Sequence, residues 1–155
     1  METIKEAKDY LRKNFEKGVV CPCCRQFVKL YKRKINAVMS RTLIRLYHLD
    51  QDKPYFHHHV KEIVKDISDT GTNDFSKLLY WGLIEEKKKD PKISKTRTSG
   101  FWIITEKGKQ FVECTLKVPS YVLVYNNVVL EYSKDLINIE DSLGENFNYK
   151  KLMNS

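Results

Sequence analysis

The sequence predicts an α+β fold, because segments with the periodicity of amphipathic helices alternate with short runs that have the composition of strands. Residues 101–104 and 121–132 are rich in β-branched and aromatic residues, and an Asn-Asn pair interrupts the second run as a hairpin turn would. A chain of 155 residues suffices for one compact domain with an appended arm. We predict an N-terminal helix with a cysteine knuckle (1–33), a central domain (34–117), and a C-terminal hairpin with short helices packed on the core (118–155).

The charge balance favours an anionic partner. The chain carries 28 Lys and Arg against 20 Asp and Glu, which gives a net charge of +8 and a pI near 9.2. This balance favours nucleic acid, although it can also serve solubility. No apolar run is long enough for a membrane span, and the first residues lack the apolar core of a signal peptide. We therefore expect a cytoplasmic protein without a membrane partner.

The N-terminal segment has the pattern of an amphipathic helix that ends at Gly18. Thr3 and Glu6 have the spacing of a capping box. The apolar residues that share one helical face are Ile4, Ala7, Leu11 and Phe15. Such a helix either covers the core or pairs with its copy in a dimer.

A C-x-x-C motif follows this helix. Cys21 and Cys24 flank Pro22, which presets the tight turn that a metal knuckle needs, and four cysteines in a cytoplasmic chain are thiols or metal ligands rather than a disulfide framework. Zinc takes four Cys or His ligands, and no second C-x-x-C occurs downstream. The same cysteines of a second chain could complete the site, as could Cys114 or one of His48, His57, His58 and His59. The alternative is a turn of small residues without metal.

Residues 25–45 contain only cations among their charged side chains. These are Arg25, Lys29, Lys32, Arg33, Lys34, Arg41 and Arg45. Apolar residues between Ile35 and Leu49 predict a helix with one buried face, and Arg41 and Arg45 gather on another face. Because uncompensated like charges repel one another, we interpret this face as a phosphate contact rather than as a merely solvated surface.

The next part of the chain predicts two short helices. The first is marked by apolar residues at helical spacing, which are Val60, Ile63, Val64 and Ile67. The residues that precede it, expected at the surface, are His57, His58 and His59. A turn with Gly71 leads to the second helix. The residues expected on its core face are Phe75, Leu78, Leu79 and Gly82, and those expected outward are Asn73, Ser76, Lys77 and Tyr80.

Two strands and a basic loop follow the second helix. Leu83 and Ile84 begin the first strand, residues 101–104 form the second, and Thr105 offers an N-cap hydroxyl to another helix. Neighbouring residues of a strand point to opposite faces, so we expect Ile84 and one of Phe101 or Trp102 to be buried. The cations of the basic loop (85–100) are Lys87, Lys88, Lys89, Lys92, Lys95 and Arg97. This order of elements is that of a winged helix-turn-helix.

The motif L-x-x-W-G-L-I-E, followed by the basic loop and G-F-W-I-I-T-E-K-G-K-Q-F, resembles the recognition helix, wing and next helix of MarR-like winged-helix regulators. The resemblance covers roughly Ile35 to Val112, and the flanks look more like a small phage or mobile-element protein. It implies a homodimer that places the recognition helix in the major groove of double-stranded DNA. The implied base-facing residues are Asn73, Ser76, Lys77 and Tyr80. Phosphate contacts are expected from Lys88, Lys92, Lys95 and Arg97, together with Arg41 and Arg45.

Two function classes therefore remain open. The first is a winged-helix DNA-binding protein that regulates transcription. The second is an interaction protein of a phage or mobile element that uses the same fold to inhibit a host nucleic-acid-handling machine, because Asp74 suits a DNA groove poorly and the hairpin at 121–132 is apolar. We expect no enzyme, since the sequence lacks a phosphate-binding Gly loop and the H-E-x-x-H and G-x-S-x-G motifs.

Overall fold

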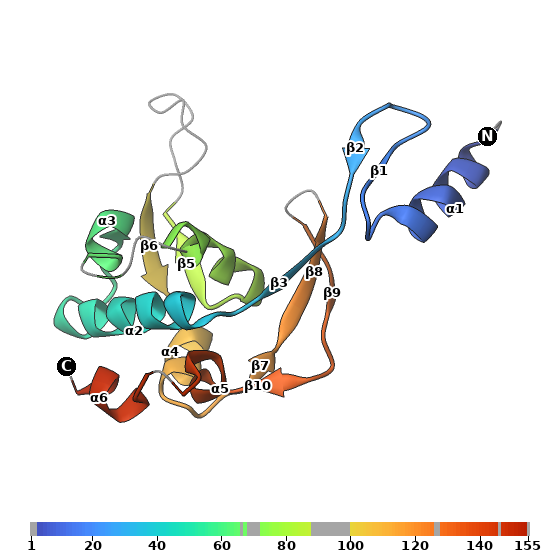
Figure 1. Cartoon of the computed structure of the whole chain (residues 1–155). Helices are drawn as coiled ribbons and strands as arrows, with labels where there is room; N and C mark the ends of the chain where they lie inside the picture. The colour runs from blue at the N-terminus through green and yellow to red at the C-terminus, as the bar shows by residue number, and fades with distance from the viewer. Residues whose placement is uncertain are drawn as a thin grey trace, which may run out of the picture. The chain divides into compact units, whose positions relative to one another are not determined.

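Figure 1 shows the computed structural model, which describes residues 3–65, 67, 72–87, 100–125, 128–145 and 147–154. Helices and strands are both present, which confirms the predicted α+β class. The contacts divide the chain into a first unit, Met1–Lys34 with Tyr121–Lys134, and a second unit, Ile35–Ser120 with Asp135–Ser155. Residues 121–134, which include the hairpin, thus group with the N-terminal segment.

The elements of the first unit are α1 (Ile4–Asn14), β1 (Val19–Val20), β2 (Phe27–Val28), β3 (Tyr31–Lys34), β8 (Tyr121–Tyr125) and β9 (Val128–Tyr132). Thr3 caps α1 as predicted, because its hydroxyl accepts a hydrogen bond from the backbone N–H of Glu6 at 3.1 Å. β1 and β2 form a short antiparallel hairpin. The predicted hairpin at 121–132 is confirmed as β8 and β9, and β8 also pairs with β3. Val122 and Val124 of β8 are buried.

The elements of the second unit are α2 (Ala37–Asp52), β4 (His58–His59), α3 (Val60–Ile63), η1 (Thr72–Trp81), β5 (Ile84–Glu86), β6 (Phe101–Ile104), α4 (Glu106–Val112), β7 (Val118–Pro119), β10 (Leu136–Ile137), α5 (Ile139–Leu143) and α6 (Tyr149–Met153). β6 lies between β4 and β5 in an antiparallel sheet, and β7 pairs with β10. The short helices expected near the C-terminus are present as α5 and α6.

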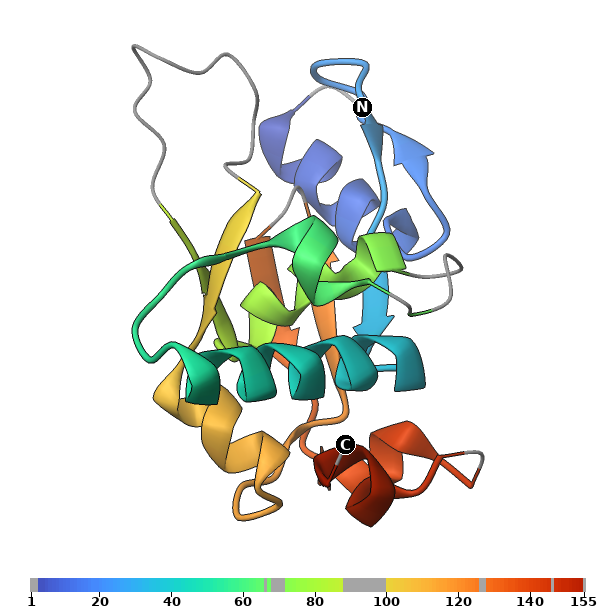
Figure 2. The ribbon, with the colours of Figure 1, turned by 90° about the vertical axis from the view of Figure 1, so that its left-hand side faces the viewer.

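The second unit is built around α2. Figure 2 shows α2 in teal with α3 and η1 on one side and α4, α5 and α6 on the other. The Asn36 side chain caps the helix by accepting from the N–H of Met39 at 2.8 Å. Leu43 and Leu46 are fully buried, and even Ser40 and Thr42 on this helix are buried. Thr42 satisfies its hydroxyl by donating to the Met39 carbonyl at 2.7 Å, so the polar group costs little.

The helix η1 is a 3₁₀-helix, and its winding changes which residues face the core. A 3₁₀-helix has three residues per turn, so Phe75, Leu78 and Trp81 share one face, and all three are buried. The prediction that Leu79 faces the core is wrong, because Leu79 falls on the next face and is 45% exposed. Gly82, with φ +72°, ends the helix as predicted.

The three-stranded sheet confirms one burial prediction and corrects another. Ile84 and Trp102 are buried while Phe101 is 39% exposed, as the alternation of the strand predicts. The prediction that all three histidines at 57–59 lie at the surface is wrong for His58, which is 2% exposed. His58 pairs with Trp102 in the register of β4 and β6, and residues paired across a ladder share a face of the sheet. His58 therefore lies on the buried face.

No helix among the described residues is long and apolar enough to cross a membrane.

Candidate nucleic-acid interface and cysteine knuckle

The surface of η1 carries most of the residues predicted to face base edges. Ser76, Lys77 and Tyr80 are partly exposed, and the Lys77 ammonium lies 5.7 Å from the Tyr80 ring centroid. Asn73 lies in η1, but its side chain is outside the described part of the structure. Leu79 adds an apolar side chain to this surface. A period of 3.6 residues wrongly places Leu79 on the core face, whereas the spacing of three residues between Phe75, Leu78 and Trp81 would have predicted its exposure.

The backbone at Leu83, just before β5, lies in close contact with α4. Gly108 on α4 packs so tightly that a Cβ there would overlap the carbonyl oxygen of Leu83. Thr105 links the end of η1 to the first turn of α4, because its hydroxyl donates to the Gly82 carbonyl at 2.6 Å and accepts from the N–H of Gly108 at 3.0 Å. The segments G-L-I (82–84) and T-E-K-G (105–108) are therefore in contact, although about twenty residues separate them in the sequence. This contact joins the start of β5 to the start of α4.

The strands β5 and β6 bring the two ends of the basic loop together. The N–H of Lys87 donates to the Phe101 carbonyl at 2.9 Å, and the N–H of Val60 donates to the Gly100 carbonyl at 2.8 Å. The predicted phosphate-binding residues of the loop lie outside the described residues, and these are Lys88, Lys92, Lys95 and Arg97. The described ends fix where the loop leaves and rejoins the sheet.

Arg41 and Arg45 line a pocket of the second unit. The pocket has a volume of about 160 Å³ and is lined by Arg41, Ile44, Arg45, His48, Ile67 and Leu152. Arg45 donates to the Lys65 carbonyl at 3.1 Å, and the Arg41 guanidinium lies 4.7 Å from the Phe147 ring centroid. Both arginines are thus half-buried and partly engaged within the unit, which leaves only part of each guanidinium for an outside ligand.

A second polar cluster in this unit is an internal network. The Lys109 ammonium lies 3.3 Å from the buried carboxylate of Asp50, and the Tyr47 hydroxyl donates to Glu113 at 3.3 Å. Burial, followed by the nearby carboxylate of Glu113, raises the pKa of Tyr47. These groups satisfy one another, so the cluster has a structural explanation without a ligand.

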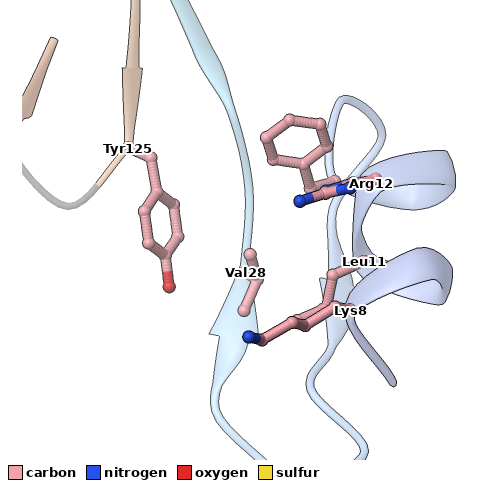
Figure 3. Close-up of a pocket in the computed structure, with 6 residues that line it drawn as sticks. Lys8, Leu11, Arg12, Val28 and Tyr125 are labelled. Atoms are coloured by element: carbon pink, nitrogen blue, oxygen red, sulfur yellow. The ribbon is translucent and has the colours of Figure 1, made fainter. Parts of the chain in front are cut away.

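The first unit contains a shallow apolar pocket of about 230 Å³, shown in Figure 3. Lys8 and Arg12 reach from α1 toward Val28 of β2, and Tyr125 of β8 lies across the gap. Leu11 and Phe15 complete the lining. This volume lies below the usual range of pockets for small organic ligands, about 300 to 1,000 Å³.

The predicted cysteine knuckle forms a tight turn between β1 and β2. The N–H of Cys21 donates to the Gln26 carbonyl, and the N–H of Arg25 donates to the Cys21 carbonyl, each at 2.8 Å. The backbone N–H groups of Cys24 and then Cys23 hydrogen-bond to the Cys21 sulfur and lower the pKa of Cys21. Cys21 is buried, whereas Cys23 and Cys24 are exposed.

The candidate metal ligands are divided between the two units. Among the residues that the structure describes, no group of three or more His, Cys, Asp or Glu side chains is arranged to hold a metal ion. Of the alternative ligands, Cys114 and all four histidines belong to the second unit. His48 bonds to the Leu152 carbonyl at 3.0 Å, and the Nδ1 atom of His58 lies 3.4 Å from a Glu62 carboxylate oxygen.

Comparisons with protein-family models, with curated proteins and with solved structures found no match to this chain.

Proposed function

We propose that residues 35–112 form a winged helix-turn-helix that binds duplex DNA, with η1 in the major groove and the basic loop on the phosphate backbone. The observation that carries the proposal is the order of elements. Along the chain α2, β4, α3, η1, β5, β6 and α4 follow one another, and β6 lies between β4 and β5 in the sheet. This arrangement supports a helix-turn-helix followed by a two-stranded wing.

The distribution of charge supports a nucleic-acid ligand at the same place. Residues 88–99 contain five cations and one acid, and the hydrogen-bonded pair Lys87–Phe101 marks where this loop begins. The exposed surface of η1 offers a hydroxyl, an ammonium and a phenol from Ser76, Lys77 and Tyr80. Such groups can donate to or accept from base edges, while loop cations neutralise phosphates without reading sequence.

A titration of DNA affinity against salt tests the proposal. We expect log K to fall linearly with log salt. Replacing Lys92, Lys95 and Arg97 together by Ala should reduce the magnitude of the slope by about 2.7, because each lost phosphate contact removes about 0.9. The matched control replaces Lys5, Arg12 and Lys13, which are exposed on α1, and removes the same charge. If both triple variants reduced the salt slope equally, only the net charge would matter. The assignment of the loop to phosphate contacts would then be wrong.

Two observations favour the alternative, in which η1 binds a protein. Leu79 is 45% exposed beside the predicted base-facing residues, and Asp74 at the start of η1 is partly exposed. An apolar side chain gains more from a protein surface than from base edges, apart from contact with a thymine methyl group. DNA binding that is absent or flat in salt would favour this alternative, and the partner would then be a protein of a host nucleic-acid machine.

A further inference from the structure

The C-x-x-C motif lies in a tight turn that backbone hydrogen bonds hold between β1 and β2. The N–H of Cys21 donates to the Gln26 carbonyl, and the N–H of Arg25 donates to the Cys21 carbonyl, each at 2.8 Å. Two cysteines at this spacing in a tight turn are the usual form of a zinc knuckle. The chain then reverses through Arg25, whose φ of +63° is uncommon for a residue with a side chain. A strained conformation held between two paired strands is typical of functional sites.

Cys21 and Cys24 alone are too few donors for a tetrahedral zinc site. Cys21 and Cys24 can occupy two of the four positions around a tetrahedral ion such as zinc. The sequence of the first unit contains no histidine and, apart from Cys23, no further cysteine. Apart from Cys23, any further thiolate or imidazole donor therefore comes from outside this unit.

An apolar pair beside the knuckle fits a second copy of the chain. Val20 and Phe27 are cross-strand partners on β1 and β2, immediately before and after the turn. They are 55% and 65% exposed, although both are large apolar side chains. The Phe27 ring lies over Gly18, where an added Cβ would clash with it. Uncovered apolar side chains next to an incomplete metal site are the features that an interface between two such hairpins would bury.

We propose that Cys21 and Cys24 of two chains together bind one Zn²⁺ and join the chains into a symmetric dimer through their β1–β2 hairpins. Each chain contributes the same two thiolates, as a twofold axis through the ion requires. The proposal goes beyond DNA binding and does not depend on it.

The test measures metal content and mass on the same reduced, purified protein. We expect one zinc per two chains by mass spectrometry of the metal, and a dimer by light scattering. A chelator should release the metal and produce monomers, and added Zn²⁺ should restore the dimer. Replacement of zinc by Co²⁺ should produce the absorption bands of a tetrahedral thiolate site. Circular dichroism during chelation shows whether the chain stays folded.

The neighbouring cysteines provide a matched pair of variants. Cys24→Ser should lose both the metal and the dimer. Cys23→Ser, which removes another exposed thiol one residue away, should keep both. One zinc per monomeric chain, lost on replacing Cys114 or a histidine, would mean that the ligands come from a single chain and would overturn the proposal. A metal-free protein after growth in zinc, or a dimer that survives both chelation and Cys24→Ser, would overturn it as well.

Discussion

Replacing Trp102 and Phe101 by alanine, one at a time, compares two aromatic neighbours that point to opposite sides of β6. Trp102 is 3% exposed, and its ring packs edge-on against Phe75 at a centroid distance of 5.8 Å. Trp102→Ala therefore removes a fully buried ring and leaves a cavity, which should lower the free energy of unfolding by about 3 to 5 kcal/mol. Phe101 is 39% exposed, so Phe101→Ala should cost only about 1 to 2 kcal/mol.

The assay is urea denaturation of both variants and the parent protein. Circular dichroism follows the whole chain, and the fluorescence of Trp81, which both variants retain, follows the second unit. We expect the urea midpoint to fall much further for Trp102→Ala than for Phe101→Ala. The slope of the unfolding free energy against urea concentration should stay unchanged. Equal losses, or a larger loss for Phe101→Ala, would refute the assignment of the buried face of β6 and with it the packing of the proposed wing strands.

Three further substitutions test contacts around η1. Gly108→Ala should cost at least about 2 kcal/mol, because its Cβ would overlap the Leu83 carbonyl. Trp81→Phe should cost about 1 kcal/mol or more, because it removes the indole N–H that donates to the Pro119 carbonyl at 2.8 Å. Thr105→Ala should cost about 1 kcal/mol, because it removes the N-cap of α4. The midpoint of urea denaturation measures the loss of stability in all three variants. If Gly108→Ala were as stable as the parent protein, the close contact between Gly108 and the Leu83 carbonyl would be wrong.

Periodicity in the sequence predicted the elements whose geometry is regular. The helix around Leu43 and Leu46 and the alternation of Ile84, Phe101 and Trp102 follow from spacings of 3.6 and 2 residues. The error at Leu79 has a physical cause. A segment of ten residues can form a 3₁₀-helix, and a period of three then moves Leu79 from the core to the surface.

Other features depend on contacts between distant segments. His58 is buried because β4 pairs with β6, more than forty residues later, in a register that places it opposite Trp102. The partner of the 121–132 hairpin is β3, and neither segment carries a local signal for that pairing. The knuckle was predicted from Cys21, Pro22 and Cys24, but the left-handed conformation at Arg25 has no signal, since glycine is the usual residue there.

The two proposals can be tested independently because their residues lie in different units. Cys21 and Cys24 belong to the first unit, whereas η1 and both ends of the basic loop belong to the second. Cys24→Ser should therefore separate the chains while each chain keeps its affinity for a single short DNA site. On DNA with two sites, the linked chains should bind about 10² to 10⁴ times more tightly than separated chains, provided the spacing lets both bind at once. The triple variant at Lys92, Lys95 and Arg97 should show the opposite pattern, with weakened DNA binding and an intact dimer. If Cys24→Ser abolished binding even to a single site, the knuckle would be part of the DNA contact itself, and the separation of roles between the two units would be wrong.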